Sequence, residues 1–259
     1  SDGSSYTMTA DVSDAAGNAA SQVTSSSFSV DTTAPSISAI ATSAFSWGAS
    51  LNATEDNSNG TVTVTTSGAE DGQTLTITLN GSTYTGSVSS NSTTVTITAA
   101  GLQALSDGSS YTMTADVSDA AGNAATTVTS SSFSVDRTAT IGAIATSAFS
   151  WGASLNATED NSNGTVTVTT TGVEDGATVT ITLNGSTYTG SVSSNSTTVT
   201  ITAAGLQGLT NGSSYTMTAD VTDANGNAAS QVTSSSFSVD TTAPSINAIA
   251  TSAMSWGSV

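Results

Sequence analysis

The chain has no cysteine, no histidine and no lysine, and Arg137 is its only basic residue. It therefore lacks nearly every side chain that acts as a nucleophile or as a proton shuttle near neutral pH. Without cysteine, no disulfide can stabilise its domains. Adjacent acids such as Glu70 and Asp71 could in principle perform acid–base chemistry, but in a glycine turn they are more typical of turn residues or metal ligands. We therefore expect that the protein is not an enzyme.

Positive charge and long apolar runs are also missing. The net charge is −18 at pH 7, which argues against nucleic acid as a partner because phosphates need cationic side chains. No apolar run is long enough to cross a bilayer, so we expect no membrane insertion in this segment.

The sequence consists of repeats. The segment SSYTMTADV occurs three times, as does the tripeptide SWG, with spacings of 104 or 105 residues. This period is the size of one ordinary domain. Because the sequence starts and stops within a repeat, we expect it to be a segment of a longer row. We predict the C-terminal part of one repeat, two complete repeats and the start of another, over residues 1–35, 36–139, 140–244 and 245–259.

Within one copy, β-branched and polar residues alternate over 61–66, 74–80, 93–98 and 110–117. Gly, Asn, Asp and Ser separate these runs at intervals typical of a β-sandwich, and only residues 99–105 suggest a helical turn. Alternation places one set of side chains inside and Thr outside. The predicted inward residues are Val62, Val64, Leu75, Ile77, Leu79, Val95, Ile97, Tyr111, Met113, Ala115 and Val117.

The large side chains recur once per copy, and we interpret them as core residues. They are Phe45, Trp47, Tyr84, Leu105, Tyr111 and Phe133. Met254 stands where Phe45 stands, an exchange that a core tolerates and a stacking platform for a ligand does not. Tyr111 follows the turn SDGS at the start of its strand, which matches a tyrosine corner.

Several segments carry a family resemblance: SWGASLNATED, AAGLQALSDGSSYTMTADVSDAAGN and FSVDTTAP. The chain resembles the bacterial immunoglobulin-like tandem repeats of giant RTX-type surface adhesins, and the near-identity of its copies is similar to the extender region of an ice-binding adhesin. The resemblance implies an all-β fold of tandem Ig-like β-sandwich domains in an elongated row, located outside the cell on a bacterial surface. The junction VDRTATIG departs from the pattern because Thr140 stands where the proline would fall.

The acidic residues are concentrated in loops, whereas the outward strand positions hold Ser and Thr. Solubility alone would scatter the charge, so a local use is indicated, although Asp and Asn are also good turn residues. In the Ig topology, two loops of a domain meet the preceding linker, and like charges there would repel unless cations bind. Calcium suits an all-oxygen set. The predicted ligands are Asp31, Glu70, Asp71, Asp116, Asp119 and Asn123 at one junction, and Asp136, Glu174, Asp175, Asp220, Asp223 and Asn227 at the next, with Asp240 in the following linker.

A second candidate calcium site is the loop ATEDNSNG, which partly matches the start of an EF-hand loop but lacks the final bidentate acid. A glycine-containing Asn turn without metal explains the loop equally well. The acids concerned are Glu55 and Asp56, with Glu159 and Asp160 in the next copy.

These features predict a structural extender, in which neighbouring repeats of the same chain are rigidified by calcium and other parts of the parent protein bind the adhesive target. Pro35 supports a stiff linker, whereas Arg137 beside Asp136 predicts weaker calcium binding or a different bend at the second junction. The alternative is a module whose outward Thr rows contact ice or a polysaccharide, although sheet twist opposes a large flat match. Cadherin-like adhesion between identical arrays is a further possibility, but no self-association face is evident.

Overall fold

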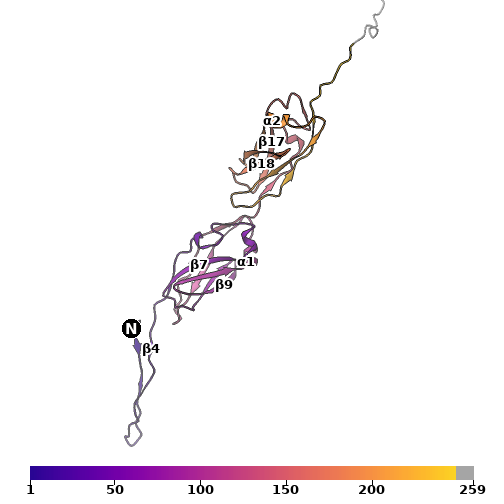
Figure 1. The fold of residues 1–259 in the computed structure, drawn as a ribbon. Coiled ribbons are helices and arrows are strands. Elements are labelled where there is room, and N and C mark those ends of the chain that lie inside the picture. The colour runs from indigo at the N-terminus through magenta and orange to yellow at the C-terminus, as the bar shows by residue number, and fades with distance from the viewer. Residues whose placement is uncertain (249–259) are drawn as a thin grey trace, which may run out of the picture. The chain divides into compact units, whose positions relative to one another are not determined.

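The structure, a computed structural model, describes residues 1–248. Residues 249–259, which include Met254 and Trp256, lie outside the described residues. The contacts within the chain divide it into two units, Ser1–Arg137 and Thr138–Val259, each with its own hydrophobic core (Figure 1). We call residues 36–137 the first domain and residues 138–244 the second domain.

The first unit is built from short strands, one α-helix and two 3-10 helices. Its strands are β1 (Ser5–Tyr6), β2 (Thr9–Ala10), β3 (Val23–Thr24), β4 (Phe28–Ser29), β5 (Ser36–Ile37), β6 (Ser50–Leu51), β7 (Gly60–Ser67), β8 (Thr74–Leu79), β9 (Ser82–Ser87), β10 (Ser92–Ile97), β11 (Ser110–Tyr111), β12 (Met113–Val117), β13 (Val128–Thr129) and β14 (Phe133–Val135). Its helices are η1 (Thr42–Ala44), η2 (Glu55–Asn57) and α1 (Ala99–Gln103).

The second unit repeats the architecture of the first domain. Its strands are β15 (Thr140–Ile141), β16 (Ser154–Asn156), β17 (Gly164–Thr171), β18 (Thr178–Leu183), β19 (Ser186–Ser191), β20 (Ser196–Ile201), β21 (Ser214–Tyr215), β22 (Met217–Asp220), β23 (Val232–Thr233) and β24 (Phe237–Asp240). Its helices are η3 (Thr146–Ala148) and α2 (Ala203–Gln207).

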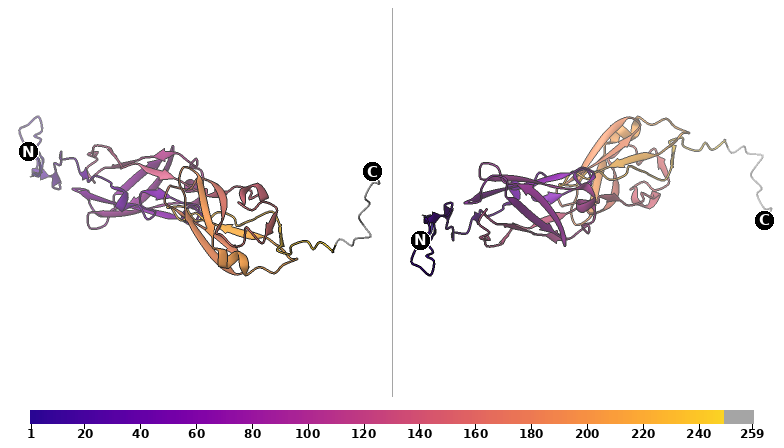
Figure 2. Two further views of the ribbon diagram at one scale, coloured as in Figure 1. Left: turned by 90° about the horizontal axis from the view of Figure 1, so that it is seen from above. Right: turned by 90° about the horizontal axis from the view of Figure 1, so that it is seen from below.

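Each domain is a sandwich of two layers (Figures 1 and 2). In the first domain one sheet has the order β10-β7-β5 and the other β13-β12-β8-β9, and a third ladder has the order β11-β14-β6. The pairs within the two main sheets are antiparallel, whereas β6 pairs with β14 in parallel. The first strand of the domain, β5, thus lies beside β7, and the strands that follow cross between layers, as in an immunoglobulin sandwich.

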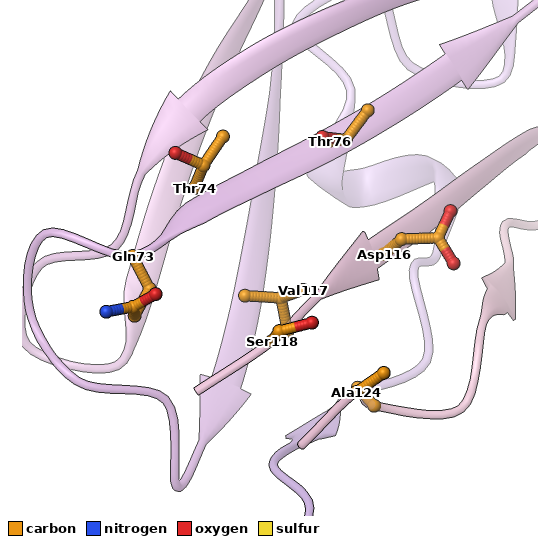
Figure 3. Close-up of a pocket in the computed structure, with 8 residues that line it drawn as sticks. Gln73, Thr74, Thr76, Asp116, Val117, Ser118 and Ala124 are labelled. Carbon is orange, nitrogen blue, oxygen red and sulfur yellow. The ribbon is translucent and has the colours of Figure 1, made fainter. Parts of the chain in front are cut away.

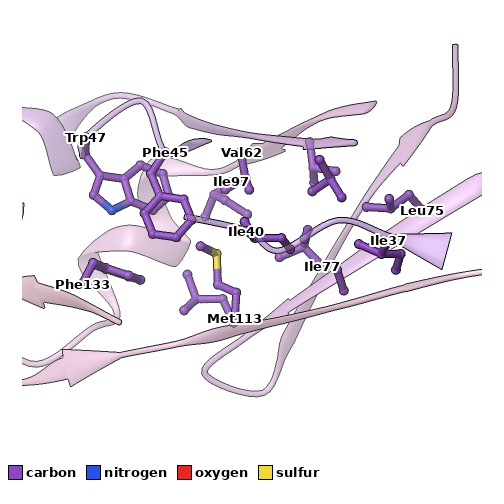
Figure 4. Close-up of a cluster of buried hydrophobic side chains, with 14 of the residues drawn as sticks. Ile37, Ile40, Phe45, Trp47, Val62, Leu75, Ile77, Ile97, Met113 and Phe133 are labelled. Carbon is purple, nitrogen blue, oxygen red and sulfur yellow. The ribbon is translucent and has the colours of Figure 1, made fainter. Parts of the chain in front are cut away.

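The alternation of the sequence accounts for the core. All the predicted inward residues are buried except Tyr111, which is half-buried and packs against the core. Phe45 stacks on Trp47 at 5.4 Å between ring centroids, and the edge of Phe133 meets both rings (Figure 4). Such aromatic contacts add to the stabilisation from burial alone.

The predicted tyrosine corner is present. The hydroxyl of Tyr111 accepts a hydrogen bond from the backbone N–H of Ser106 at 2.8 Å, and Tyr215 repeats the contact with Thr210 at 2.9 Å. The predicted helical turn is also present, as α1. Its N-cap Thr98 accepts a hydrogen bond from the N–H of Gly101, as favourable caps do.

Two details differ from expectation. The strand β9 was not predicted, because its sequence STYTGS has only one large apolar residue and its side chains stay mostly exposed. That residue, Tyr84, is only half-buried at the rim of the core.

Within residues 1–248, no helix has the length and apolar character needed to span a membrane.

Candidate metal sites

The N-terminal end of the first domain is where the predicted junction acids lie. The strand β5 pairs with the last residues of β7, so the linker before it runs beside the loop between β7 and β8. Gly68 in that loop has φ +81°, and an added Cβ would lie 3.4 Å from Cα of Pro35. Linker and loop are therefore packed closely together.

Four of the predicted ligands take part in hydrogen bonds here. The carboxylate of Glu70 accepts a hydrogen bond from the N–H of Ala120 at 2.8 Å, which joins the loop after β7 to the loop after β12. Asp119 accepts two bonds from Asn123, from the backbone N–H and from the side-chain Nδ2, each at 2.8 Å. The same Nδ2 donates to the backbone carbonyl of Asp31 at 3.2 Å. The result is an oxygen-rich group that borders the linker.

The carboxylate of Asp119 is buried and held in its ionised form. The hydrogen bonds from the Asn123 side chain and then from backbone N–H groups hold the pKa of Asp119 below the ordinary value of 3.8. Donors aimed at a carboxylate stabilise the anion more than the neutral acid. A charged oxygen group is therefore present at this end across the physiological pH range.

The second domain repeats this local network within its own unit. Glu174 accepts from the N–H of Ala224 at 2.9 Å, and Asp223 accepts from the backbone and side chain of Asn227 at 2.8 Å each. Of the two linker acids, Asp136 donates its N–H to the carbonyl of Leu51 within the first unit. Asp240 ends β24 and accepts from the N–H of Thr242 at 3.1 Å.

Four other predicted ligands face elsewhere in their domains. Asp71 and Asp175 each accept from the N–H of a serine, Ser90 or Ser194, at 2.7 Å in the turn after β9 or β19. These serines have positive φ, a conformation that needs such support. The remaining two, Asp116 and Asp220, lie on strands β12 and β22 and bond to neighbouring side chains.

Asp116 lies on the rim of a shallow hollow of about 330 Å³, with Gln73, Thr76 and Ser118 (Figure 3). Its carboxylate accepts a hydrogen bond from the hydroxyl of Thr127. Among residues 1–248, no group of three or more acidic side chains is arranged to hold a metal ion. The N-terminal end therefore offers a mixed set of carboxylate, amide and carbonyl oxygens rather than a cluster of carboxylates.

The loop ATEDNSNG lies at the opposite, C-terminal end of the first domain. Glu55 accepts from the N–H of Asn52 at 3.1 Å, Asn57 accepts from Gln103 at 3.2 Å, and Asn59 accepts from the N–H of Ala99 at 2.9 Å. The last two contacts fasten the loop to α1. In the second domain Glu159 accepts from the N–H of Asn156 at 3.0 Å.

Arg137 forms the main contact that sequence reasoning missed. Its Nε donates to Asp56 at 2.5 Å, and its two terminal nitrogens donate to the carbonyls of Leu105 and Leu102 at 2.7 and 2.8 Å. Its backbone N–H donates to Asp107 at 2.7 Å. The side chain thus turns back into its own domain, whereas the sequence suggested only a charge beside Asp136. The replacement of Thr by Arg at this one copy was the available signal.

Two sandwich domains of one topology, in tandem along one chain, define a class of tandem immunoglobulin-like modules. No protein-family model matches the sequence, and no curated protein matches it. Solved structures do match, and several of them come from bacterial adhesins. A bacterial immunoglobulin-like domain from the ice-binding adhesin of M. primoryensis is 30% identical, with 40% of this chain and 96% of that chain covered and a TM-score of 0.29. The chain therefore belongs to the family of bacterial immunoglobulin-like adhesin domains.

Two longer structures are also similar. A Ca²⁺-stabilised adhesin that helps an Antarctic bacterium reach out and bind ice is 30% identical over 91% of this chain, with a TM-score of 0.49. A 1.5-MDa bacterial ice-binding adhesin is 26% identical over 93% of this chain, also with a TM-score of 0.49. The chain spans 57% of the former structure's length and 76% of the latter's.

Proposed function

We propose that this chain is a stretch of the extender region of a giant bacterial cell-surface adhesin. Its near-identical domains act as structural spacers that carry an adhesive part of the parent protein away from the cell, and they perform no catalysis. Support comes from the tandem repetition, from the family and from the lack of histidine, cysteine and lysine. The neighbouring repeats of the same chain are the proposed partners.

Calcium is the proposed ligand at the N-terminal end of each domain. One similar adhesin is calcium-stabilised, and the oxygen-only donors present here fit a hard cation of irregular coordination. The proposed ligands are Asp31, Glu70, Asp119 and Asn123, and in the second copy Glu174, Asp223 and Asn227. Asp71, Asp116, Asp175 and Asp220 instead support turns and strands of their own domains.

The observation that carries this proposal is the hydrogen bond from Nδ2 of Asn123 to the carbonyl of Asp31. It ties the loop that holds Asp119 to the linker, which supports the proposal that oxygens of both bind one ion. A bound cation would supply positive charge among these carboxylate, amide and carbonyl oxygens. Ordering of the linker by these residues would stiffen the chain.

Small-angle scattering of the 259-residue chain with calcium and with chelator tests the proposal. We expect a narrow distribution of particle lengths with calcium, and a broader one with chelator. The double variant Asp119→Asn, Asp223→Asn should behave with calcium as the wild type does with chelator. The matched double variant Asp71→Asn, Asp175→Asn should respond as the wild type does, because these acids bond to turns. Identical curves for the wild type with and without calcium would refute the proposal.

A second candidate function rests on the outer face of β7 and β10. Their Thr residues pair in register, Thr63 with Thr94 and Thr61 with Thr96, and the hydroxyls of the first pair lie 3.5 Å apart. This regular hydroxyl array could contact a flat solid such as ice. Thermal hysteresis separates the two functions: a pure spacer leaves the freezing point at the melting point, and Thr63→Lys has no effect.

A further inference from the structure

The C-terminal end of each domain holds a small group of hydrogen-bond acceptors. In the first domain this group comprises the carboxylate of Asp56 and the backbone carbonyls of Leu102 and Leu105, and the guanidinium of Arg137 bonds to all three. Asp56 is only 6% exposed. The buried carboxylate needs a positive partner, and the first domain supplies it from its own chain, through a guanidinium that also bonds to the two carbonyls.

The second domain has the same acceptors without the cation. The loop and the helix that carry them are joined by the same bonds: Asn163 accepts from the N–H of Ala203 at 3.0 Å, and Asn161 accepts from Gln207 at 3.1 Å. The corresponding distances in the first domain are 2.9 and 3.2 Å. The residues equivalent to the three acceptors lie on this loop and helix, and they are Asp160, Leu206 and Leu209.

The position equivalent to Arg137 is Thr241. Its backbone N–H donates to Asn211 at 2.8 Å, as that of Arg137 donates to Asp107 at 2.7 Å. The backbone thus takes the same course in both copies, but the threonine side chain is too short to reach the acceptors. Within residues 1–248, the carboxylate of Asp160 forms no hydrogen bond or ion pair.

The local structure responds to this difference. Residues Glu55–Asn57 form the 3-10 helix η2 around the buried Asp56, whereas residues 159–161 form an ordinary turn and Asp160 is half-buried. A carboxylate that is not paired stays closer to water. Within residues 1–248, the acceptors of the second domain therefore have no basic side chain that pairs with them as Arg137 pairs with Asp56.

We propose that the carboxylate of Asp160 and the carbonyls of Leu206 and Leu209 form a calcium site inside the second domain, and that Arg137 takes the place of this ion in the first domain. All three ligands are oxygens, and water completes the coordination sphere of six to eight that calcium takes. The site lies within one domain, so it is separate from the ligands proposed at the N-terminal ends. The first domain then keeps its C-terminal end ordered without metal, and the second needs calcium to do so.

Calorimetric titration of calcium into the full chain tests this site. We expect Thr241→Arg to bind one ion fewer than the wild type, because the new guanidinium occupies the acceptors. Asp160→Asn should lose the same ion. The control Ser236→Arg adds the same charge at an exposed position before β24 and should keep the wild-type number. Arg137→Thr should gain one ion, and if that variant does not fold, the Thr241→Arg arm decides the question.

The outcomes distinguish this site from the proposed junction calcium. A wild-type chain that binds calcium, with no ion lost in Thr241→Arg, overturns the site and leaves the junction ligands standing. Loss of the only bound ion in Thr241→Arg supports the site and removes the junction calcium. A wild-type chain that binds no calcium overturns both.

Discussion

The contact between Arg137 and Asp56 should make the two domains respond differently to the same substitution. Asp56→Asn keeps the size of the side chain and removes its charge, so the guanidinium, whose side chain is 16% exposed, loses its counter-ion. Removing one partner of a well-buried pair costs about 3–5 kcal/mol. This pair retains some exposure, and Arg137 keeps its two carbonyl acceptors. We therefore expect the free energy of unfolding of the first domain to fall by about 2–3 kcal/mol.

The equivalent substitution in the second domain is the internal control. Asp160 has no such partner, so Asp160→Asn in calcium-free buffer should change the free energy by less than about 0.5 kcal/mol. Hydrogen exchange measures each domain separately, because the strands β8 and β18 differ in sequence, TLTITL against TVTITL. We expect exchange in β8 to accelerate about 30- to 150-fold in Asp56→Asn, and exchange in β18 to stay unchanged. Equal effects of the two substitutions on their own domains would refute the reasoning.

Two further predictions concern packing and pH. Gly60→Ala should destabilise the first domain by about 1–3 kcal/mol in urea unfolding, because the new Cβ would lie 2.5 Å from Cζ3 of Trp47; a loss under 0.5 kcal/mol would show that the indole moves freely. The pKa of Asp119 is lower in the folded than in the unfolded chain, so its contribution to stability is present above about pH 4 and is lost as the pH falls through the folded pKa. The urea midpoint should fall less between about pH 4 and pH 2 in Asp119→Asn than in the wild type.

Much of the fold could be predicted from local pattern. Strict alternation in β7, β8, β10 and β12 identified the strands and the side of each that faces the core, because a period of two permits only one buried face. The edge strand β9 was missed because it shows little alternation of this kind. Apart from Tyr84 its side chains are small or polar, and cross-strand pairing with β8 holds it in place. Tertiary pairing, not pattern, decides such a segment.

The junction residues show where sequence reasoning loses resolution. Loop position led us to expect Glu70, Asp119 and Asn123 near the linker, since topology determines which loops share an end of the sandwich. It could not tell which way each side chain turns, and Asp71, next to Glu70, bonds to Ser90 in the turn after β9. Adjacent residues in an extended loop point in different directions, so a run of acids rarely acts as one group.

The differences between nearly identical copies carry information that one copy alone does not. The same position holds Thr32, Arg137 and Thr241 in successive repeats, while the acceptors around it in the two complete domains are kept. Where a positive side chain replaces a neutral one and bonds to every acceptor within reach, the neutral copies must satisfy those acceptors by other means, either water or a cation. Asp160 is half-buried and, within residues 1–248, its carboxylate has no hydrogen-bond partner. A charge partly withdrawn from water is stabilised by a paired cation, and this is the physical reason to look for an ion there.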